Sequence, residues 1–303
     1  MHAKAMTIDT MSDDHEPGFP PIVLAFSAAD PSSGTGIQAD VLTLASMGCH
    51  PLSVITALTV QDTIGVEATQ PVDAEWVADQ ARCLLEDMPV DAFKIGALGS
   101  VENFAAVAEI LSDYPDVPVI LDPVVVGGRG EDVATDEMVH ALTELLLPHT
   151  TILVASSSRI RRLAESDDDD EPALSGCATA LIEAGCEFVL ITGTHEPSRE
   201  IVNTLYSKSG VVRTDSWQRL PGNFHGAGST LAAAVAAMVA NGLDMPEAVR
   251  EAQDYTWHTL KKAYRPGMGR FLPDRLFWAR EETEPRSDAS HTLTQRVDAR
   301  DSH

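Results

Sequence analysis

The sequence predicts an α/β fold in which a doubly wound, mostly parallel sheet carries helices on both faces. Short runs of apolar and β-branched residues alternate with segments of helical periodicity, which is typical of successive β-α-β units. Glycine-rich or aspartate-containing segments follow several of these runs, where open sheets of this kind bind ligands. The chain has 303 residues and 44% apolar content, enough for one substantial core.

The expected elements follow one another in the order of such a fold. Strands are predicted at 22–26, 52–58, 93–95, 119–121, 152–154 and 188–191. Helices are predicted at 37–48, 73–87, 101–113, 134–146 and 173–184. Two further runs, 202–206 and 211–217, predict a hairpin that turns near Ser209 and Gly210. Helices at about 228–241 and 246–263 complete the pattern.

Composition limits the domain organisation and the cysteine chemistry. Both ends are polar and lack periodicity, so we expect disordered tails at 1–19 and 281–303 and a single domain at 20–280. Residues 165–171, with four consecutive aspartates, are expected to form a solvated loop, with metal binding as the less favoured alternative. The scattered cysteines are expected to be reduced and buried: Cys49, Cys83, Cys177 and Cys186.

Charge and hydropathy exclude several classes of partner. The formal net charge of −25 argues against nonspecific binding to nucleic acid, whose phosphates would be repelled. No apolar run has transmembrane length, and the first nineteen residues carry Asp13, Asp14 and Glu16 where a signal peptide needs an apolar centre. We therefore expect a cytoplasmic protein with neither a nucleic-acid nor a membrane partner.

The segment Asn223-Phe-His-Gly-Ala-Gly-Ser-Thr230 precedes an alanine-rich helical run that ends at Ala240. Its glycines allow a sharp turn, after which the first N–H groups of the helix point outward with the positive end of the helix dipole. This arrangement favours a phosphate or a developing phosphoryl charge. Ordinary loop geometry is the alternative for this segment taken alone.

Four further motifs accompany this segment at strand ends. They are Phe26-Ser-Ala-Ala-Asp-Pro-Ser-Ser-Gly-Thr-Gly-Ile-Gln-Ala-Asp40, Thr56-Ala-Leu-Thr-Val-Gln-Asp-Thr63, Leu121-Asp-Pro-Val124 and Ile191-Thr-Gly-Thr-His195. In order and spacing, from about residue 20 to about 275, the chain resembles the hydroxymethylpyrimidine/phosphomethylpyrimidine kinases of thiamine synthesis, within the ribokinase-like superfamily. The resemblance implies a ribokinase-like fold, ATP and Mg²⁺ as cofactors, and a small pyrimidine substrate. A homodimer is left open.

The substrate pocket is expected at the first motif and at Gln61. Asp30 follows a strand, and Gly34 and Gly36 let the backbone approach a small flat molecule. The resemblance implies that this loop lines the pyrimidine pocket; a simple Asp-Pro turn with a helix cap is the alternative for Asp30. The amide of Gln61 carries a donor and an acceptor, which match the edge of an aminopyrimidine, against the alternative of a surface loop residue.

The resemblance also implies a catalytic set. Asp122 would belong to the polar network beside the transferred phosphate and would bind the metal, whereas an Asp-Pro turn is its structural alternative. Gly226 and Gly228 would form the anion hole. Ser229 stands where relatives carry a cysteine or an aspartate that acts as the base. Lys94, at another strand end, has the plain alternative of a charge at the rim.

Nucleotide contacts are expected at Thr192, Gly193 and Arg159. Relatives usually carry an asparagine and a glutamate that organise magnesium and the phosphates, where this chain has Ser156 and Arg159. Arg159 is therefore a candidate for direct contact with the nucleotide phosphates, against the alternative of an exposed basic helix start. Arg129, in the glycine-rich segment 127–130, is a candidate to neutralise phosphate charge from a lid.

Two classes of function follow. The first is an active kinase that phosphorylates 4-amino-5-hydroxymethyl-2-methylpyrimidine and, in a second step, its monophosphate. The second is a catalytically reduced family member that binds a pyrimidine or pyridoxal-type ligand as a sensor or regulatory subunit. A kinase acting on pyridoxal is a third option, which Gln61 disfavours.

Overall fold

The computed structural model describes residues 19–124, 134–164, 173–193 and 196–280. The expected acidic loop at 165–171, the segment with Arg129, His195 and nearly all of both expected tails lie outside the described residues. The strands are β1 (Ile22–Ala29), β2 (His50–Gln61), β3 (Val66–Pro71), β4 (Ala92–Ile95), β5 (Val119–Leu121), β6 (Ile152–Ser156), β7 (Phe188–Thr192), β8 (Glu200–Ser207) and β9 (Gly210–Gln218). They form one sheet in the order β3-β2-β1-β4-β5-β6-β7-β8-β9.

The pairing of the strands is parallel in the centre and antiparallel at both edges. Strands β2, β1, β4, β5, β6 and β7 run parallel to one another. At one edge β3 runs antiparallel to β2, and at the other β8 and β9 form the predicted hairpin beside β7. Because the six central strands are parallel, their carboxyl ends meet along one side of the sheet.

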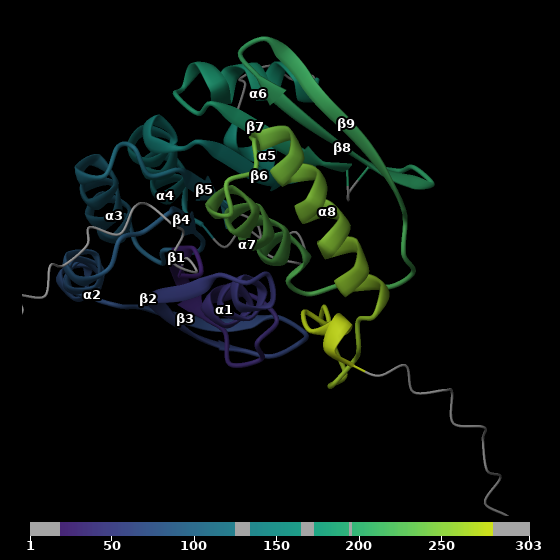
Figure 1. Cartoon of the computed structure of the whole chain (residues 1–303), viewed down its shortest axis with the longest axis horizontal. Helices are drawn as coiled ribbons and strands as arrows, with labels where there is room; N and C mark the ends of the chain where they lie inside the picture. The colour runs from purple at the N-terminus through teal and green to yellow at the C-terminus, as the bar shows by residue number, and fades with distance from the viewer. Residues whose placement is uncertain (1–18, 125–133, 165–172, 194–195, 281–303) are drawn as a thin grey trace, which may run out of the picture.

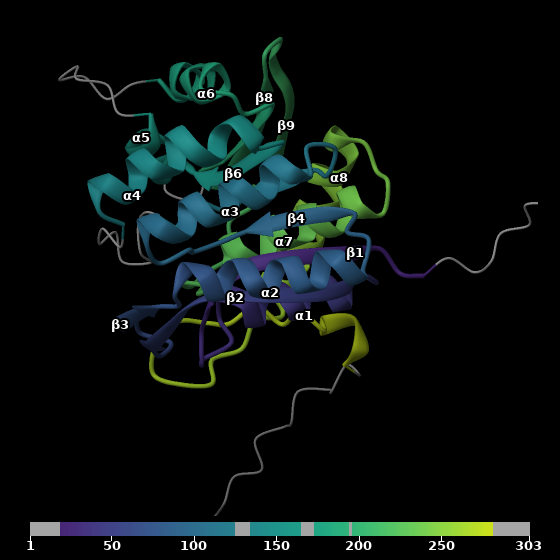
Figure 2. The same ribbon diagram turned by 90° about the vertical axis from the view of Figure 1, so that its left-hand side faces the viewer.

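Helices cover both faces of the sheet (Figures 1 and 2). They are α1 (Gly36–Ser46), α2 (Ala74–Asp87), α3 (Val101–Asp113), α4 (Asp136–Ala141), α5 (Ser157–Leu163), α6 (Leu174–Glu183), α7 (Ala227–Ala240) and α8 (Met245–Lys261). One core cluster joins α1, α7 and α8 to one face, and the other joins α2 to α6 to the opposite face. The predicted doubly wound α/β class is confirmed.

Helix α7 lies at the centre of its layer. All residues from Ser229 to Ala237 are buried, and the helix packs across β1, β4, β5 and β6. Alanine side chains allow this close approach because they add little volume between the helix and the sheet. The buried position fixes the N-terminus of α7 beside the carboxyl ends of the central strands.

Two elements were not among the expected ones. Strand β3 is polar and mostly exposed, so no buried face gives it the alternation of a strand. Helix α5 has only seven residues and begins with serines and arginines, which weaken its apolar pattern. The prediction of buried cysteines is wrong for Cys83, which is exposed, although the other three are buried and all four are free.

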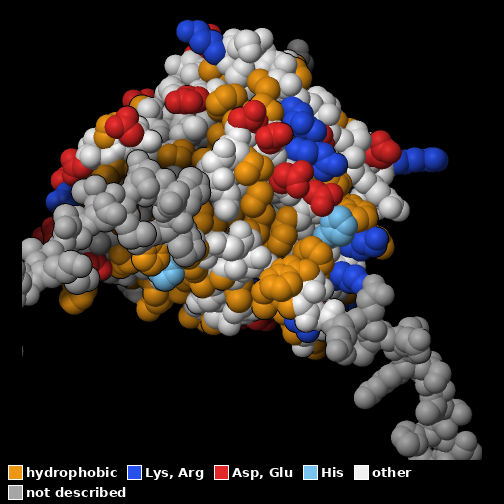
Figure 3. All heavy atoms as spheres, viewed as in Figure 1, with side chains coloured by type: hydrophobic (Ala, Val, Ile, Leu, Met, Phe, Trp, Pro, Cys, Tyr) orange, Lys and Arg blue, Asp and Glu red, His pale blue; other side chains and the backbone are white. Residues whose placement is uncertain are grey.

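None of the helices in the described parts of the chain has the length and apolar character needed to cross a membrane. The surface over α8 and the adjoining hairpin carries acidic and basic side chains next to one another (Figure 3). There Arg250 lies 4.0 Å from a carboxylate oxygen of Asp215 and 3.8 Å from one of Asp254. The acidic excess of the chain is thus locally balanced on this face.

Lys94 of β4 is fully buried, so the alternative of a rim charge is wrong. Its Nζ lies 2.9 Å from Oδ1 and 3.0 Å from Oδ2 of Asp40, on α1, and 3.7 Å from Oδ2 of Asp122. Burial raises the pKa of Asp40 to about 6, although Lys94 acts in the opposite direction. One buried cation therefore connects a helix, a central strand and the carboxylate that follows β5.

Replacing Lys94 by methionine should remove about 3–5 kcal/mol from the free energy of unfolding, because two buried carboxylates lose their common cation. Urea denaturation followed by circular dichroism would measure the loss. Arg82→Gln is the control, since Arg82 pairs with Glu109 at the exposed surface and its loss should hardly matter. Equal effects of the two variants would contradict the structural role of Lys94.

Candidate active site

A cavity of about 1360 Å³ opens where the parallel strands end. It brings together predicted residues from distant parts of the chain: Asp30, Gly36, Gln61, Ser156, Arg159, Thr192, Gly226, Gly228 and Ser229. Three other predicted residues, Gly34, Asp122 and Gly193, do not line it. Each of the three instead contacts residues around the cavity or the strands behind it.

The loop after β1 is organised by Asp30. One carboxylate oxygen accepts from the N–H and hydroxyl of Ser32, each at 2.7 Å, and the other from the N–H (2.7 Å) and hydroxyl (2.9 Å) of Thr35. Nε2 of His225 lies 3.3 Å from the second oxygen. Burial would raise the pKa of Asp30, but these hydrogen bonds, with that of His225 foremost, hold it well below its usual range. Asp30 therefore shapes the loop as well as lining the cavity.

This loop interlocks with the loop that leads into α7. Gly226 has a φ of 96°, and a Cβ atom at this position would lie only 1.7 Å from the carbonyl oxygen of Gly34. A Cβ on Gly34 would lie 2.1 Å from Cδ2 of His225. Gly226 is needed because the two backbones pass too close for a side chain there, and Gly34 leaves room for the imidazole of His225.

Arg275 connects the loop after β1 to the start of α7. It is buried and donates to the carbonyl oxygens of Ser33 (3.0 Å) and Gly34 (2.6 Å) and to Oγ1 of Thr230 (3.1 Å). Ser33 has a φ of 59°, which is uncommon for a residue other than glycine. The guanidinium thus stabilises a strained turn and ties it to the first turn of α7.

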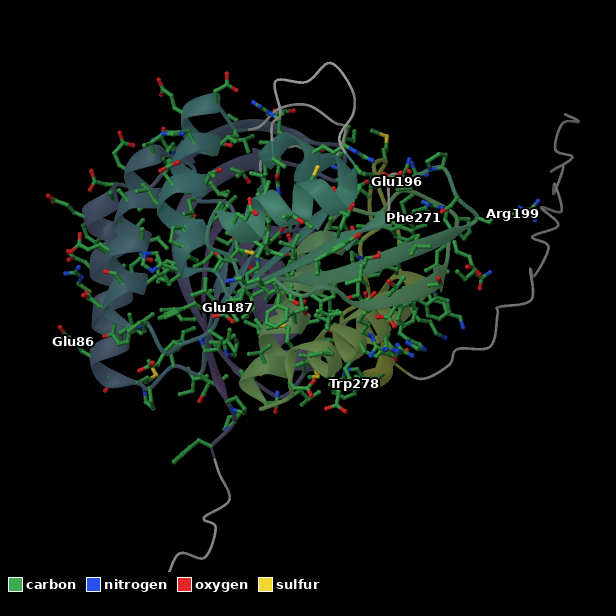
Figure 4. All side chains as sticks on the ribbon, turned by 90° about the horizontal axis from the view of Figure 1, so that it is seen from above. Glu86, Glu187, Glu196, Arg199, Phe271 and Trp278 are labelled. Carbon is green, nitrogen blue, oxygen red and sulfur yellow. The ribbon has the colours of Figure 1, made fainter. Side chains whose placement is uncertain are left out.

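Gln61, at the end of β2, lies on the cavity wall. Its Nε2 donates a hydrogen bond to Oγ1 of Thr35 at 3.3 Å. The amide oxygen of Gln61 takes no part in this hydrogen bond. The turn after β2 meets the C-terminal segment, where the N–H of Arg270 donates to the carbonyl of Thr63 at 2.9 Å. Next to it Phe271, labelled in Figure 4, packs on Phe224 with ring centroids 6.1 Å apart. These contacts close one side of the cavity.

The N-terminus of α7 faces the cavity. The first intrahelical bond begins at the N–H of Thr230, which donates to the carbonyl of Gly226 at 2.9 Å. The preceding N–H groups have no partner within the helix, which is the arrangement that binds anions. A Cβ atom at Gly228 would be in ordinary van der Waals contact with Nη1 of Arg159, at 3.7 Å, and with Oδ1 of Asp122, at 4.0 Å.

Asp122 lies directly behind this anion site and is buried. Its Oδ2 accepts a hydrogen bond of 3.0 Å from Oγ of Ser229, and its Oδ1 one of 3.1 Å from Nη1 of Arg159. Lys94 lies 3.7 Å from Oδ2. Two cations and a hydroxyl thus surround this one carboxylate.

A magnesium ion held directly by Asp122 does not fit this arrangement. Both carboxylate oxygens are engaged, and no group of three or more His, Cys, Asp or Glu side chains suited to a metal occurs among the described residues. Arg159 adds a like charge: two unit charges 4 Å apart interact by about 4 kcal/mol at an effective dielectric constant of 20, and a divalent ion doubles this. A metal ligated by Asp122 would have to displace Arg159 or Ser229.

The predicted nucleotide residues lie at two neighbouring strand ends. Thr192 ends β7 and lines the cavity, while the N–H of Gly193 donates to Oδ1 of Asn203 at 3.1 Å. A Cβ on Gly193 would lie 2.4 Å from the carbonyl oxygen of Val202, so a side chain is excluded by β8. Ser156 ends β6 on the same wall, with its hydroxyl 3.1 Å from that of Ser158.

His225 and Arg275 were missed by sequence reasoning. His225 stands inside the segment that was singled out, and its position directly before Gly226 could have been a signal. Arg275 follows the last helix, more than 240 positions from Ser33 and Gly34, and no local pattern marks it. Its contacts become visible only in the folded chain.

Comparison with known proteins gives a consistent result. The family model described as phosphomethylpyrimidine kinase matches residues 30–274. The hydroxymethylpyrimidine/phosphomethylpyrimidine kinase of Mycobacterium leprae is 34% identical, over 86% of this chain and 96% of the relative. The protein of the same description in Escherichia coli K12 is 31% identical, over 79% of this chain and 91% of the relative.

Solved structures share the fold. A phosphomethylpyrimidine kinase from Clostridium difficile 630 has a TM-score of 0.68 at 27% identity, covering 78% of this chain and 97% of that one. The ADP complex of Bacillus subtilis pyridoxal kinase has a TM-score of 0.78 at 22% identity, covering 86% and 100%, and shows likeness of fold. With a family model that spans most of its length and relatives this similar, the chain belongs to the phosphomethylpyrimidine kinase family.

Proposed function

We propose that this protein transfers the γ-phosphoryl group of ATP to the hydroxymethyl oxygen of 4-amino-5-hydroxymethyl-2-methylpyrimidine, and then phosphorylates the monophosphate, in thiamine synthesis. Its relatives are named for these activities. The observation that carries the proposal is one cavity that joins the Asp30 loop and Gln61 to the N-terminus of α7. A pyrimidine at one end and a phosphoryl group at the other would share this space.

The two ends of the cavity have different chemistry. In the proposed complex, Gln61 hydrogen-bonds to the aminopyrimidine edge, beside the loop that contains Asp30, Gly34 and Gly36. The N–H groups after Gly226 face the transferred phosphoryl group, whose charge spreads over its outer oxygens in a loose transition state. Positioning and charge neutralisation then supply most of the rate enhancement.

A proton must leave the substrate hydroxyl as the new O–P bond forms and the bond from Pγ to the leaving oxygen breaks. The hydroxyl of Ser229 donates a hydrogen bond to Oδ2 of Asp122. We assign Asp122 as the acceptor, with Ser229 receiving the substrate proton as it passes its own to the carboxylate. The hydrogen bond thus connects a carboxylate to a position where serine alone would not ionise near neutral pH.

The nucleotide is expected to lie along Thr192, Gly193 and Arg159. Solved members of the superfamily include pyridoxal kinases with ADP and AMP-PCP, which supports ATP as the donor. Magnesium, implied by the family resemblance, would be carried by the nucleotide phosphates. The predicted role of Asp122 as a metal ligand stays a prediction that its contacts with Arg159 and Ser229 disfavour.

The full chain, ATP, Mg²⁺ and the hydroxymethylpyrimidine should give a phosphate ester, identified by mass spectrometry. Pyridoxal in place of the pyrimidine serves as the competing substrate and should give less product. If calorimetry shows pyrimidine binding while no ester forms, the sensor or regulatory role becomes the better account.

Gln61→Ala should weaken pyrimidine binding by about 1–3 kcal/mol, because polar groups of the ligand lose their partner in the cavity. Isothermal titration calorimetry with the pyrimidine alone measures this loss. Gln70→Ala is the matched control, since Gln70 lies on exposed β3 outside the cavity lining. An affinity equal to that of the unmodified protein would remove Gln61 from the pocket.

Ser229→Ala should lower turnover by about 10²-fold, the lower end of the contribution of a positioned proton acceptor, because the substrate hydroxyl loses its link to Asp122. Nucleotide affinity should hardly change, since the anion contacts come from backbone N–H groups. Ser229→Cys should retain or exceed the original rate, as a thiol at a helix N-terminus ionises more readily. Steady-state kinetics decide, and full activity of the alanine variant would exclude the relay.

Three broader expectations stay predictions. We propose that residues 20–280 act as one kinase domain, which agrees with a single sheet and with the extent of the family match. The cytoplasmic location is expected from the sequence, and a homodimer stays an open possibility.

A further inference from the structure

Arg159 occupies the position from which a cation would reach a phosphoryl group at the start of α7. Its Nη1 is 3.1 Å from Asp122 and would be 3.7 Å from a Cβ atom at Gly228, so the guanidinium stands directly in front of the helix N-terminus. The side chain is 22% exposed and lines the cavity. It is thus held by a buried carboxylate and lies on the cavity wall.

The surroundings of Arg159 explain why this cation can remain in place. Asp122 is buried and provides a fixed anchor, while the planar guanidinium offers several donors in different directions. Its Nη1 donates to Asp122. Because a guanidinium can donate in several directions, it can hold a carboxylate and contact a phosphate oxygen, whereas the compact ammonium group of a lysine is less suited to contacting both.

We propose that Arg159 takes the place of a divalent ion held by the protein, so that this kinase binds the phosphates of its nucleotide through a guanidinium and the α7 N-terminus without needing a metal bridge to the protein. Both oxygens of Asp122 accept hydrogen bonds, and the described residues contain no group of three or more His, Cys, Asp or Glu side chains that could hold a metal. The inference rests on the proposed function, because it assumes that the cavity accepts a nucleotide.

The test is the binding of AMP-PCP to the full chain, measured by calorimetry in excess EDTA and again with Mg²⁺. The unmodified protein should lose less than about tenfold in affinity when Mg²⁺ is removed. Arg159→Glu should bind about 10- to 100-fold more weakly than the unmodified protein in EDTA, the usual effect of losing a charged hydrogen bond. Mg²⁺ should restore much of this loss, because the new glutamate and Asp122 together form a pair of metal-ligating carboxylates.

Arg82→Glu is the control for the charge reversal, since Arg82 is exposed on α2 and outside the cavity lining. Its affinity for AMP-PCP should follow that of the unmodified protein under both conditions. Arg159→Lys should lie between the two, because lysine keeps the charge and loses the fork of donors. Arg159→Gln, close to arginine in its stem, carries the same test if thermal melting shows that the glutamate variant does not fold.

Two outcomes would overturn the proposal. One is nucleotide binding by the unmodified protein that disappears in EDTA; the other is equal affinity of the unmodified protein and the Arg159 variants in EDTA. Failure of the proposed function gives a different signature. In that case AMP-PCP binds in EDTA and depends on Arg159, while no phosphate ester of the pyrimidine is formed with ATP.

Discussion

The close contact between the loop after β1 and the start of α7 is the constraint on which the site depends. At Gly226 the two backbones approach so closely that a Cβ would lie 1.7 Å from the carbonyl oxygen of Gly34. His225 and Arg275 both contact this loop: His225 lies beside the carboxylate of Asp30, and Arg275 donates to the carbonyl oxygen of Gly34. Pocket and anion site are therefore parts of one rigid unit, and the distance between a bound substrate and the phosphoryl site is set by the fold.

A chain of buried charged residues connects the core to the candidate active site. Asp40, Lys94 and Asp122 form a row of buried charges that begins on α1, crosses β4 and ends beside Ser229. Removing such groups from water costs several kcal/mol per ion, and their mutual attraction offsets this only with close geometry. Lys94 contacts both Asp40 and Asp122, the carboxylate that we propose as the proton acceptor. On this proposal, stability and reactivity depend on the same lysine.

The fold was largely predictable because its central strands are short and buried and its helices are amphipathic or, in α7, uniformly small and apolar. Strand β3 could not be predicted in this way, because an exposed edge strand needs no apolar face. Within the site, the rule that ligands bind where parallel strands end placed Asp30, Asp122 and Thr192 together. Lys94 was harder, because a charge is ordinarily exposed, and Arg275 could not be found from a local pattern.

Two of the three positions at which the family resemblance implies a different residue meet at one carboxylate. Ser229 and Arg159 are far apart in sequence, yet they contact the two oxygens of Asp122. A serine in place of an ionisable residue removes a candidate base. An arginine in place of a carboxylate removes a candidate metal ligand. In the proposed arrangement, Asp122 accepts the substrate proton through the hydroxyl of Ser229, while its second oxygen contacts Arg159 instead of a metal. On this proposal the two residues belong to one altered arrangement of charge around Asp122, in which the buried carboxylate accepts the proton and the guanidinium neutralises phosphate charge.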